Sequence, residues 1–177
     1  MKKVIGLLAI LVMVSGMGFA QTSTNKFTLS GKALGYVAGG TGLVAADAAA
    51  EIKFDAKAPY AARTDNIILS TQSNTSNLAV FDLAGLEYTL PASKVFTALK
   101  LNPKKFSAYA FGEFGSDTTA TGVAQAYSAG GGVNYAVNDS VTANLFEVRY
   151  LHGPVPISPS QTVSNGVAVS VGFSFGK

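Results

Sequence analysis

The C-terminal segment of the chain alternates strictly between large apolar residues and small ones. Residues 161–175 read QTVSNGVAVSVGFSF, and alanine, glycine and serine separate the large apolar residues Val167, Val169, Val171, Phe173 and Phe175. Successive side chains of a β-strand point to opposite faces, so this pattern predicts a strand with one bulky apolar face and one small, polar face. The apolar face can meet a second sheet, as in a soluble protein, or lipid, as in a membrane barrel.

Seven further segments carry strand patterns, which makes eight expected strands. Most of them approach the ~9–11 residues that a strand needs to cross a bilayer at a tilt. In the fourth segment the alternation shifts near Gly85, where we expect a β-bulge. The eight predicted strands are residues 26–37, 50–56, 66–72, 78–90, 106–114, 124–137, 141–151 and 166–176.

The connections between these segments alternate in length. Asn138-Asp139 predicts a tight turn, whereas residues 38–46, 115–123 and 152–165 predict longer, polar or glycine-rich loops. Short periplasmic turns and long outer loops are typical of outer-membrane barrels. Residues 57–65 and 91–105 do not fit, because both are long where a short turn is expected, and residues 95–101 can form an additional short strand.

The N-terminus has the three parts of a secretory signal peptide. Lys2 and Lys3 precede an apolar run over residues 4–14, and small residues follow up to Ala20. We therefore expect residues 1–20 to be a cleaved signal and residues 21–177 to form one barrel domain. Beyond the signal no apolar run reaches the ~18 residues of a membrane helix. Only a closed barrel would then place the mature chain in a membrane, since it satisfies every backbone polar group.

Composition removes several classes of function. Removing Lys2 and Lys3 with the signal leaves 11 basic residues against 10 acidic ones, so the mature net charge is only +1. No basic stripe with interleaved aromatic residues is present, which argues against nucleic-acid binding. The chain has no cysteine and one histidine, so neither a metal site nor any cofactor is expected.

Charged residues occupy the face opposite the apolar one in the seventh predicted strand. Phe146, Val148 and Tyr150 share one side with Asn144, while Glu147 and Arg149 share the other. A Lys or Arg facing lipid at mid-depth costs ~2–4 kcal/mol, so the charged side is expected to face the lumen. The predicted lumen network joins Glu147 and Arg149 with Lys32, Glu51, Lys53 and Asp55.

Residues 108–153, together with the closing VAVSVGFSFGK, resemble the second half of OmpA-like outer-membrane β-barrel proteins. The glycine-rich GGGVNY segment, the Asn138-Asp139 turn, the EVRYL segment and the closing FSF occur in the same order as in that family. The resemblance implies an eight-stranded barrel in the outer membrane. The chain departs from the family by ending on Gly176-Lys177 instead of an aromatic residue, and it has no tryptophan, so tyrosines would have to supply the interfacial aromatic residues.

His152 is the one candidate catalytic residue, with Ser158 and Ser160 downstream. Some eight-stranded outer-membrane barrels are lipid A deacylases or acyltransferases that use a histidine and a serine near the outer rim. Here Pro154, Pro156 and Pro159 interrupt the segment, and no spacing places either serine on the strand face of His152. We therefore expect no catalytic residues and no enzymatic activity.

These observations predict an all-β chain that forms an eight-stranded, antiparallel, up-and-down transmembrane β-barrel in the outer membrane. Eight strands enclose only enough room for their own side chains, so no open pore is expected. The expected role is structural, with outer-membrane lipid around the barrel and a surface partner at the outer loops. The alternatives are a secreted soluble β-sandwich, such as an adhesin or fibre subunit, and, less favoured, a lipid-modifying barrel enzyme.

Overall fold

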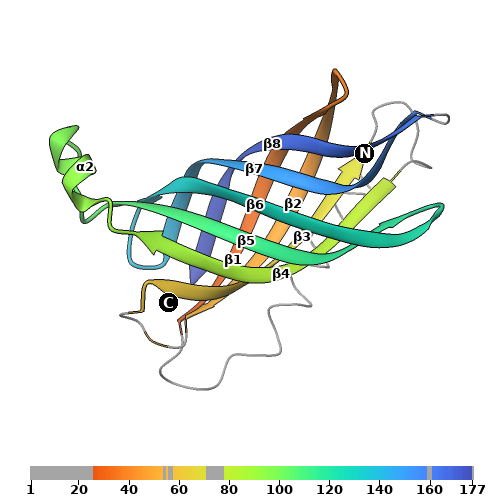
Figure 1. Ribbon diagram of the computed structural model, residues 1–177. Helices are drawn as coiled ribbons and strands as arrows, with labels where there is room; N and C mark the ends of the chain where they lie inside the picture. Colours follow the sequence, from red (N-terminus) through yellow and green to blue (C-terminus); the bar gives the residue numbers. More distant parts are fainter. Residues whose placement is uncertain (1–25, 54, 56–57, 71–77, 159–160, 177) are drawn as a thin grey trace.

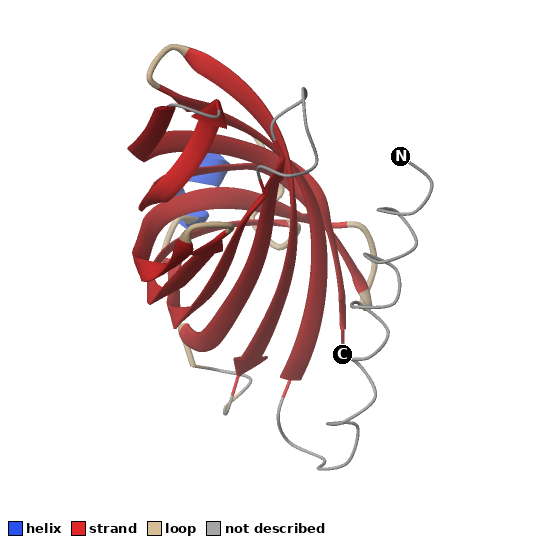
Figure 2. Cartoon of the chain, turned by 90° about the vertical axis from the view of Figure 1, so that its right-hand side faces the viewer, coloured by secondary structure: helices blue, strands red, loops and turns tan. Residues whose placement is uncertain are grey.

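The computed structural model describes residues 26–53, 55, 58–70, 78–158 and 161–176, so the expected signal segment lies outside the described residues. Eight antiparallel strands follow one another in sequence order, and β1 pairs with β8 to close a barrel (Figures 1 and 2). The predicted fold class is confirmed. The strands are β1 (Lys26–Ala38), β2 (Thr41–Lys53), β3 (Tyr60–Ser70), β4 (Leu78–Leu90), β5 (Phe106–Thr119), β6 (Gly122–Ala136), β7 (Val141–Ser158) and β8 (Gln161–Gly176).

The barrel has two different ends. At one end, here called the hairpin end, β1 joins β2, β3 joins β4, β5 joins β6 and β7 joins β8. At the other, the α2 end, lie the short helix α2 (Ser93–Ala98), the β6–β7 turn and the end of β8 (Figure 1). Within the described residues no helix is both long and apolar enough to cross a membrane.

The predicted long loops at the hairpin end are wrong, because the strands continue through them. β2 begins at Thr41 after the turn residues Gly39 and Gly40, whose φ angles of 56° and 80° favour glycine. Likewise only residues 120–121 separate β5 from β6, and β7 and β8 extend into residues 152–165. Threonine and valine in these segments favour the extended backbone, so strand pairing continues beyond the predicted boundaries.

The third strand begins six residues earlier than predicted. Tyr60 pairs with Tyr88, and the register continues without interruption to Ser70 opposite Leu78. Residues 60–65, which were expected to belong to a long connection, are therefore part of a strand. Its inward positions include Arg63 and Asp65, and charged inward residues remove the apolar alternation that identifies a strand.

Residues 91–105 contain a helix, where the sequence also allowed a short additional strand over residues 95–101. α2 spans Ser93–Ala98, and the Thr97 hydroxyl donates a hydrogen bond to the Ser93 carbonyl oxygen at 2.9 Å. The ring of Phe96 packs on that of Phe106, with centroids 5.7 Å apart. The segment is thus a helical connection docked on the start of β5.

The irregularities of the sheet lie in β7 and not at Gly85. Pairing of β4 with both neighbours passes through Gly85 unbroken, so the bulge predicted there is wrong. Glycine is required for a different reason, since a Cβ at this position would meet the carbonyl oxygen of Gly112. The register instead shifts between Asn144 and Glu147, which leaves both Leu145 and Phe146 exposed and turns Asn144 inward, opposite to its predicted side.

Candidate functional site

The inward-facing residues form two layers. The layer toward the α2 end is charged, whereas the layer toward the hairpin end is a buried apolar cluster. The apolar layer was not predicted from the sequence, because the large apolar residues were all expected on the outward face of the barrel. Its members are Leu34, Tyr36, Ala38, Leu43, Ala45, Ile67, Leu69, Ala79, Phe81, Leu83, Ala126, Leu151, Val155 and Ala168.

Glu147 of β7 is the central acceptor of the charged layer. One of its carboxylate oxygens, Oε2, accepts hydrogen bonds from Lys32 Nζ and Arg63 Nη2, both at 2.9 Å. The Tyr109 hydroxyl donates to the same oxygen at 2.7 Å. These donors come from β1, β3 and β5, so one carboxylate connects four strands across the lumen.

Arg149 of β7 is the central donor of the charged layer. Its Nη2 atom lies 3.1 Å from Asp47 and 2.5 Å from Asp65, and its Nε donates to Glu147 at 3.0 Å. The side chain is 1% exposed, so these ion pairs are fully removed from water. A guanidinium group buried in this way requires carboxylate partners, and three carboxylates supply them.

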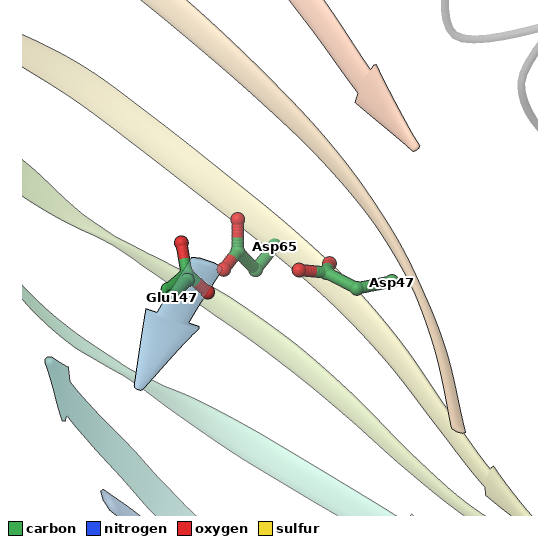
Figure 3. A group of neighbouring side chains, drawn as sticks. All are labelled: Asp47, Asp65 and Glu147. Atoms are coloured by element: carbon green, nitrogen blue, oxygen red, sulfur yellow. The ribbon is translucent and has the colours of Figure 1, made fainter. Parts of the chain in front are cut away.

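Asp47, Asp65 and Glu147 converge from β2, β3 and β7 (Figure 3). One oxygen from each lies within 4.8 Å of the others, which makes them the group in the described residues that can hold a metal ion. However, all three are already ion-paired to a mixture of Lys32, Arg63 and Arg149. The cationic side chains therefore provide the positive charge that a metal ion would otherwise supply.

A second set of acidic residues surrounds Arg63. Its Nη1 atom lies 3.1 Å from Glu87, and its Nε atom lies 3.4 Å from Glu113. The guanidinium group of Arg63 also lies over the ring of Phe111, 4.0 Å from its centroid. The guanidinium group of Arg149 lies 5.0 Å from the centroid of the same ring. Both arginines are thus held by carboxylates and by an aromatic ring.

The glycine-rich stretch of β6 makes room for these aromatic residues. A Cβ at Gly130 would lie 2.8 Å from the ring of Phe111, and a Cβ at Gly132 would lie 2.6 Å from the Tyr109 hydroxyl. Both distances are far shorter than carbon atoms tolerate. The GGG sequence therefore permits Tyr109 and Phe111 to fill the lumen beside the arginines.

The structure brings together only part of the predicted lumen set. Lys32, Glu147 and Arg149 are buried and in contact, as described above. Glu51 and Lys53 are half-buried near the α2 end of β2, where Lys53 Nζ lies 3.4 Å from the Thr89 hydroxyl. Asp55 is exposed beyond the end of β2. Five further charged residues of the lumen were not predicted from the sequence: Asp47, Arg63, Asp65, Glu87 and Glu113. For Asp47 a signal was available, because it lies among alanines at an alternate position of β2 and shares a face with Ala45 and Ala49.

Asp117 differs from the other buried acidic residues. It is 0% exposed, and within the described residues neither of its carboxylate oxygens has a hydrogen-bond partner and it makes no ion pair, whereas Glu113, which also has no hydrogen bond, lies 3.4 Å from Arg63. It points into the apolar layer, where a Cβ at Gly153 would lie 3.2 Å from the carboxyl group. A buried polar group without a partner carries a desolvation cost, so this residue is a local defect in an otherwise apolar packing.

The outward face carries an apolar band. The alternating residues of β8, which were expected to face lipid, are between 46% and 57% exposed. Toward the hairpin end the band meets a row of polar residues that the strand register aligns, and the Asn66 amide hydrogen-bonds to the Asp82 carboxylate. The row consists of Asn66, Asp82, Ser116 and Gln125.

The height of the apolar band can be estimated along β5. Phe106 and Ser116 are about ten residues apart, which at ~3.4 Å per residue and a tilt of ~40° corresponds to a height of about 26 Å. The apolar band of outer-membrane barrels is ~25 Å tall. On β4 the band is narrower, because Asp82 lies only eight residues from the exposed Leu90 at the end of the strand.

His152 lies on the outward face and not in the lumen. Its ring stacks on that of Tyr127 with centroids 4.4 Å apart, and its Nδ1 atom lies 2.7 Å from the amide oxygen of Asn165. The side chains of Ser158 and Ser160 are outside the described residues. His152 is thus an aromatic partner near the edge of the apolar band.

The fold is similar to that of solved outer-membrane barrels. Neisserial surface protein A shares 12% sequence identity over 86% of this chain and 97% of that chain, with a TM-score of 0.58. The chain has the fold of an eight-stranded outer-membrane β-barrel. The attachment invasion locus protein Ail of Yersinia pestis aligns with 7% identity over 88% of this chain and 100% of that chain, with a TM-score of 0.46. Neither a family model nor a curated protein sequence matches the chain. The expected resemblance to OmpA-like barrels is confirmed at the level of the fold.

Proposed function

We propose that this chain is a small outer-membrane protein with a structural and surface-interaction role. The observation that carries the proposal is an exposed apolar band of about membrane height around a lumen that holds ion pairs. Lipid would stabilise such an arrangement, because in water the exposed apolar residues of the outward face would be solvated unfavourably. In this reading Val167, Val169, Val171, Phe173 and Phe175 face lipid.

The lumen network would specify closure of the barrel. Lys32, Glu147 and Arg149, with the acidic residues around them, connect β1, β2, β3 and β7 by ion pairs that form only when the strands are in register. The arginine side chains, the two aromatic rings and the apolar layer also fill the lumen. We therefore propose that the barrel has no open path for solutes.

The hairpin end would present the surface that contacts a partner. There β5 and β6, and likewise β7 and β8, extend beyond the polar row of Asn66, Asp82, Ser116 and Gln125. The described part of these extensions is rich in threonine, serine and proline, and its one acidic residue, Asp117, is buried. A partner would thus bind through hydrogen bonds and shape, and not through charge.

The proposal is tested by expressing the full chain in a Gram-negative host and following it through fractionation. We expect a protein that has lost residues 1–20, sediments with the outer membrane, needs detergent for extraction and changes gel mobility on heating. Intact-mass measurement of the extracted protein checks the cleavage after Ala20. Recovery in the soluble periplasm without detergent would refute the membrane location and favour a secreted soluble protein.

A further inference from the structure

Basic residues outside the lumen are concentrated at the α2 end. Within the described residues they include Lys53 at the end of β2 and four lysines in the β4–β5 connection: Lys94, Lys100, Lys104 and Lys105. The strand segments that extend beyond the polar row at the hairpin end contain no lysine or arginine. The two ends of the barrel therefore differ in charge, although the mature chain is nearly neutral. Residues 91–105 contain these four lysines and no acidic residue.

The same segment packs on the outward wall of the barrel. Phe96 of α2 contacts Phe106, whose ring lies 5.0 Å from that of Tyr135. Phe106 and Tyr135 occupy outward positions of β5 and β6, because the alternate residues of both strands are buried inside. Lys105 completes the contact, with its Nζ atom 3.4 Å from the Tyr135 hydroxyl. α2 thus lies against the outward wall, at the edge of the apolar band nearest the α2 end, and does not cover the opening of the lumen.

Apolar side chains of this segment remain exposed. Val95 is 58% exposed, Leu99 is 63% exposed and Leu101 is 38% exposed, while Phe96 alone packs inward on the barrel. The combination of exposed apolar residues and lysines in one short segment is typical of a membrane interface. There the apolar groups enter the acyl region, and lysines extend their amino groups to the phosphates.

We propose that residues 91–105 bind anionic phospholipid headgroups at the membrane surface that surrounds the α2 end. The inference rests on the proposed membrane location of the barrel. Each lysine near an anionic surface contributes attraction, and the four lysines lie beside residues that water would solvate poorly. A cell-wall polymer would also attract lysines, but it would leave Val95 and Leu99 in water, so the apolar residues favour lipid.

The absence of tryptophan from the chain makes a sharp test possible. The full mature chain with Leu99→Trp is reconstituted into vesicles that contain phosphatidylcholine and phosphatidylglycerol in fixed proportion. In one preparation the phosphatidylcholine is brominated, and in the other the phosphatidylglycerol is brominated, at equal mole fraction of quencher. A second protein carries Val169→Trp on β8, an outward position of the apolar band four residues farther from the α2 end than Phe173, which shares the register of Tyr135.

We expect brominated phosphatidylglycerol to quench the tryptophan at position 99 at least about twofold more than brominated phosphatidylcholine, since the lysines enrich anionic lipid around α2. The preference should disappear when Lys94, Lys100, Lys104 and Lys105 are all replaced by glutamine. It should persist when the same four residues are replaced by arginine. The tryptophan at position 169 should be quenched equally by both lipids in every background.

The outcomes separate this proposal from the membrane location itself. Quenching at position 169 without quenching at position 99 would overturn the lipid-binding proposal and leave the barrel in the membrane. Absence of quenching at both positions would overturn the membrane location. Equal quenching of position 99 by the two lipids would overturn the headgroup preference. Lysine-dependent sedimentation with purified peptidoglycan, in place of lipid preference, would assign the surface to the cell wall and equally overturn the proposal.

Discussion

Replacing Glu147 by glutamine tests the lumen network at its central acceptor. The substitution keeps the size of the side chain but removes the charge that pairs with Lys32, Arg63 and Arg149. Removing one partner of a buried ion pair costs ~3–5 kcal/mol, because the other charge stays buried. Asp65 lies 2.7 Å from Arg63 and 2.5 Å from Arg149 and retains part of the compensation. We therefore expect a loss of about 2–4 kcal/mol in the free energy of unfolding.

The measurement is equilibrium unfolding by urea in lipid vesicles, followed by circular dichroism and by the fraction of heat-sensitive compact protein on gels. With a urea dependence of ~2 kcal/mol per molar, a loss of 2 kcal/mol lowers the midpoint by about 1 M. Asp139→Asn is the matched control, because it removes an exposed carboxylate from the β6–β7 turn. Equal midpoints for E147Q and the unaltered protein would refute the argument that these charges stabilise closure.

Three further predictions concern single positions in the barrel. Arg149→Glu adds a carboxylate to a site that already holds several, and we expect it to abolish the heat-sensitive compact form in detergent; unchanged gel mobility would contradict the lumen assignment. Gly85→Ala should destabilise strongly because its Cβ meets the Gly112 carbonyl oxygen, whereas Gly112→Ala, with open space around the new Cβ, should not; similar urea midpoints would refute this. Asp117→Asn should raise the free energy of unfolding by about 1 kcal/mol, because a neutral amide is cheaper to bury unpaired than a carboxylate. Asp65→Asn should lower it by ~2–4 kcal/mol, since it breaks buried ion pairs, so shifts of the same sign at the two aspartates would count against the lumen geometry.

The fold class was predictable from the sequence because the eight strand patterns share one period, and the closing strand shows it most clearly. The strand limits were less predictable. Segment 57–65 lost its strand signal because Arg63 and Asp65 face inward, and an alternating pattern with charge on its inner face resembles a solvated loop. At the hairpin end the strands continue through the predicted loops because threonine and valine there favour the extended backbone and pair with a neighbouring strand.

The site was only partly predictable, because its composition depends on register. Glu147 and Arg149 alternate with apolar residues within one strand, so their inward position is visible locally. Asp47 and Arg63 become partners of that pair only when β2 and β3 are placed around the barrel. The bulge before Glu147 reverses the side of Asn144, and no local pattern marks it.

On β3 and β4 the change from the charged to the apolar layer of the lumen coincides with the polar row on the outward face. Beside the charged layer the outward face is an apolar band, and burying apolar groups in the lumen gives no advantage over exposing them to lipid. Ion pairs in register therefore provide specificity there. At Asn66 and Asp82 the outward face becomes polar, and the inward residues beside them, Ile67 and Phe81, belong to the apolar layer, where burial away from water is favourable. Phe81→Ala should consequently destabilise the barrel by ~3–5 kcal/mol in urea, as in a soluble core, whereas Phe173→Ala on the outward face, which the proposed membrane location places in lipid, should cost much less.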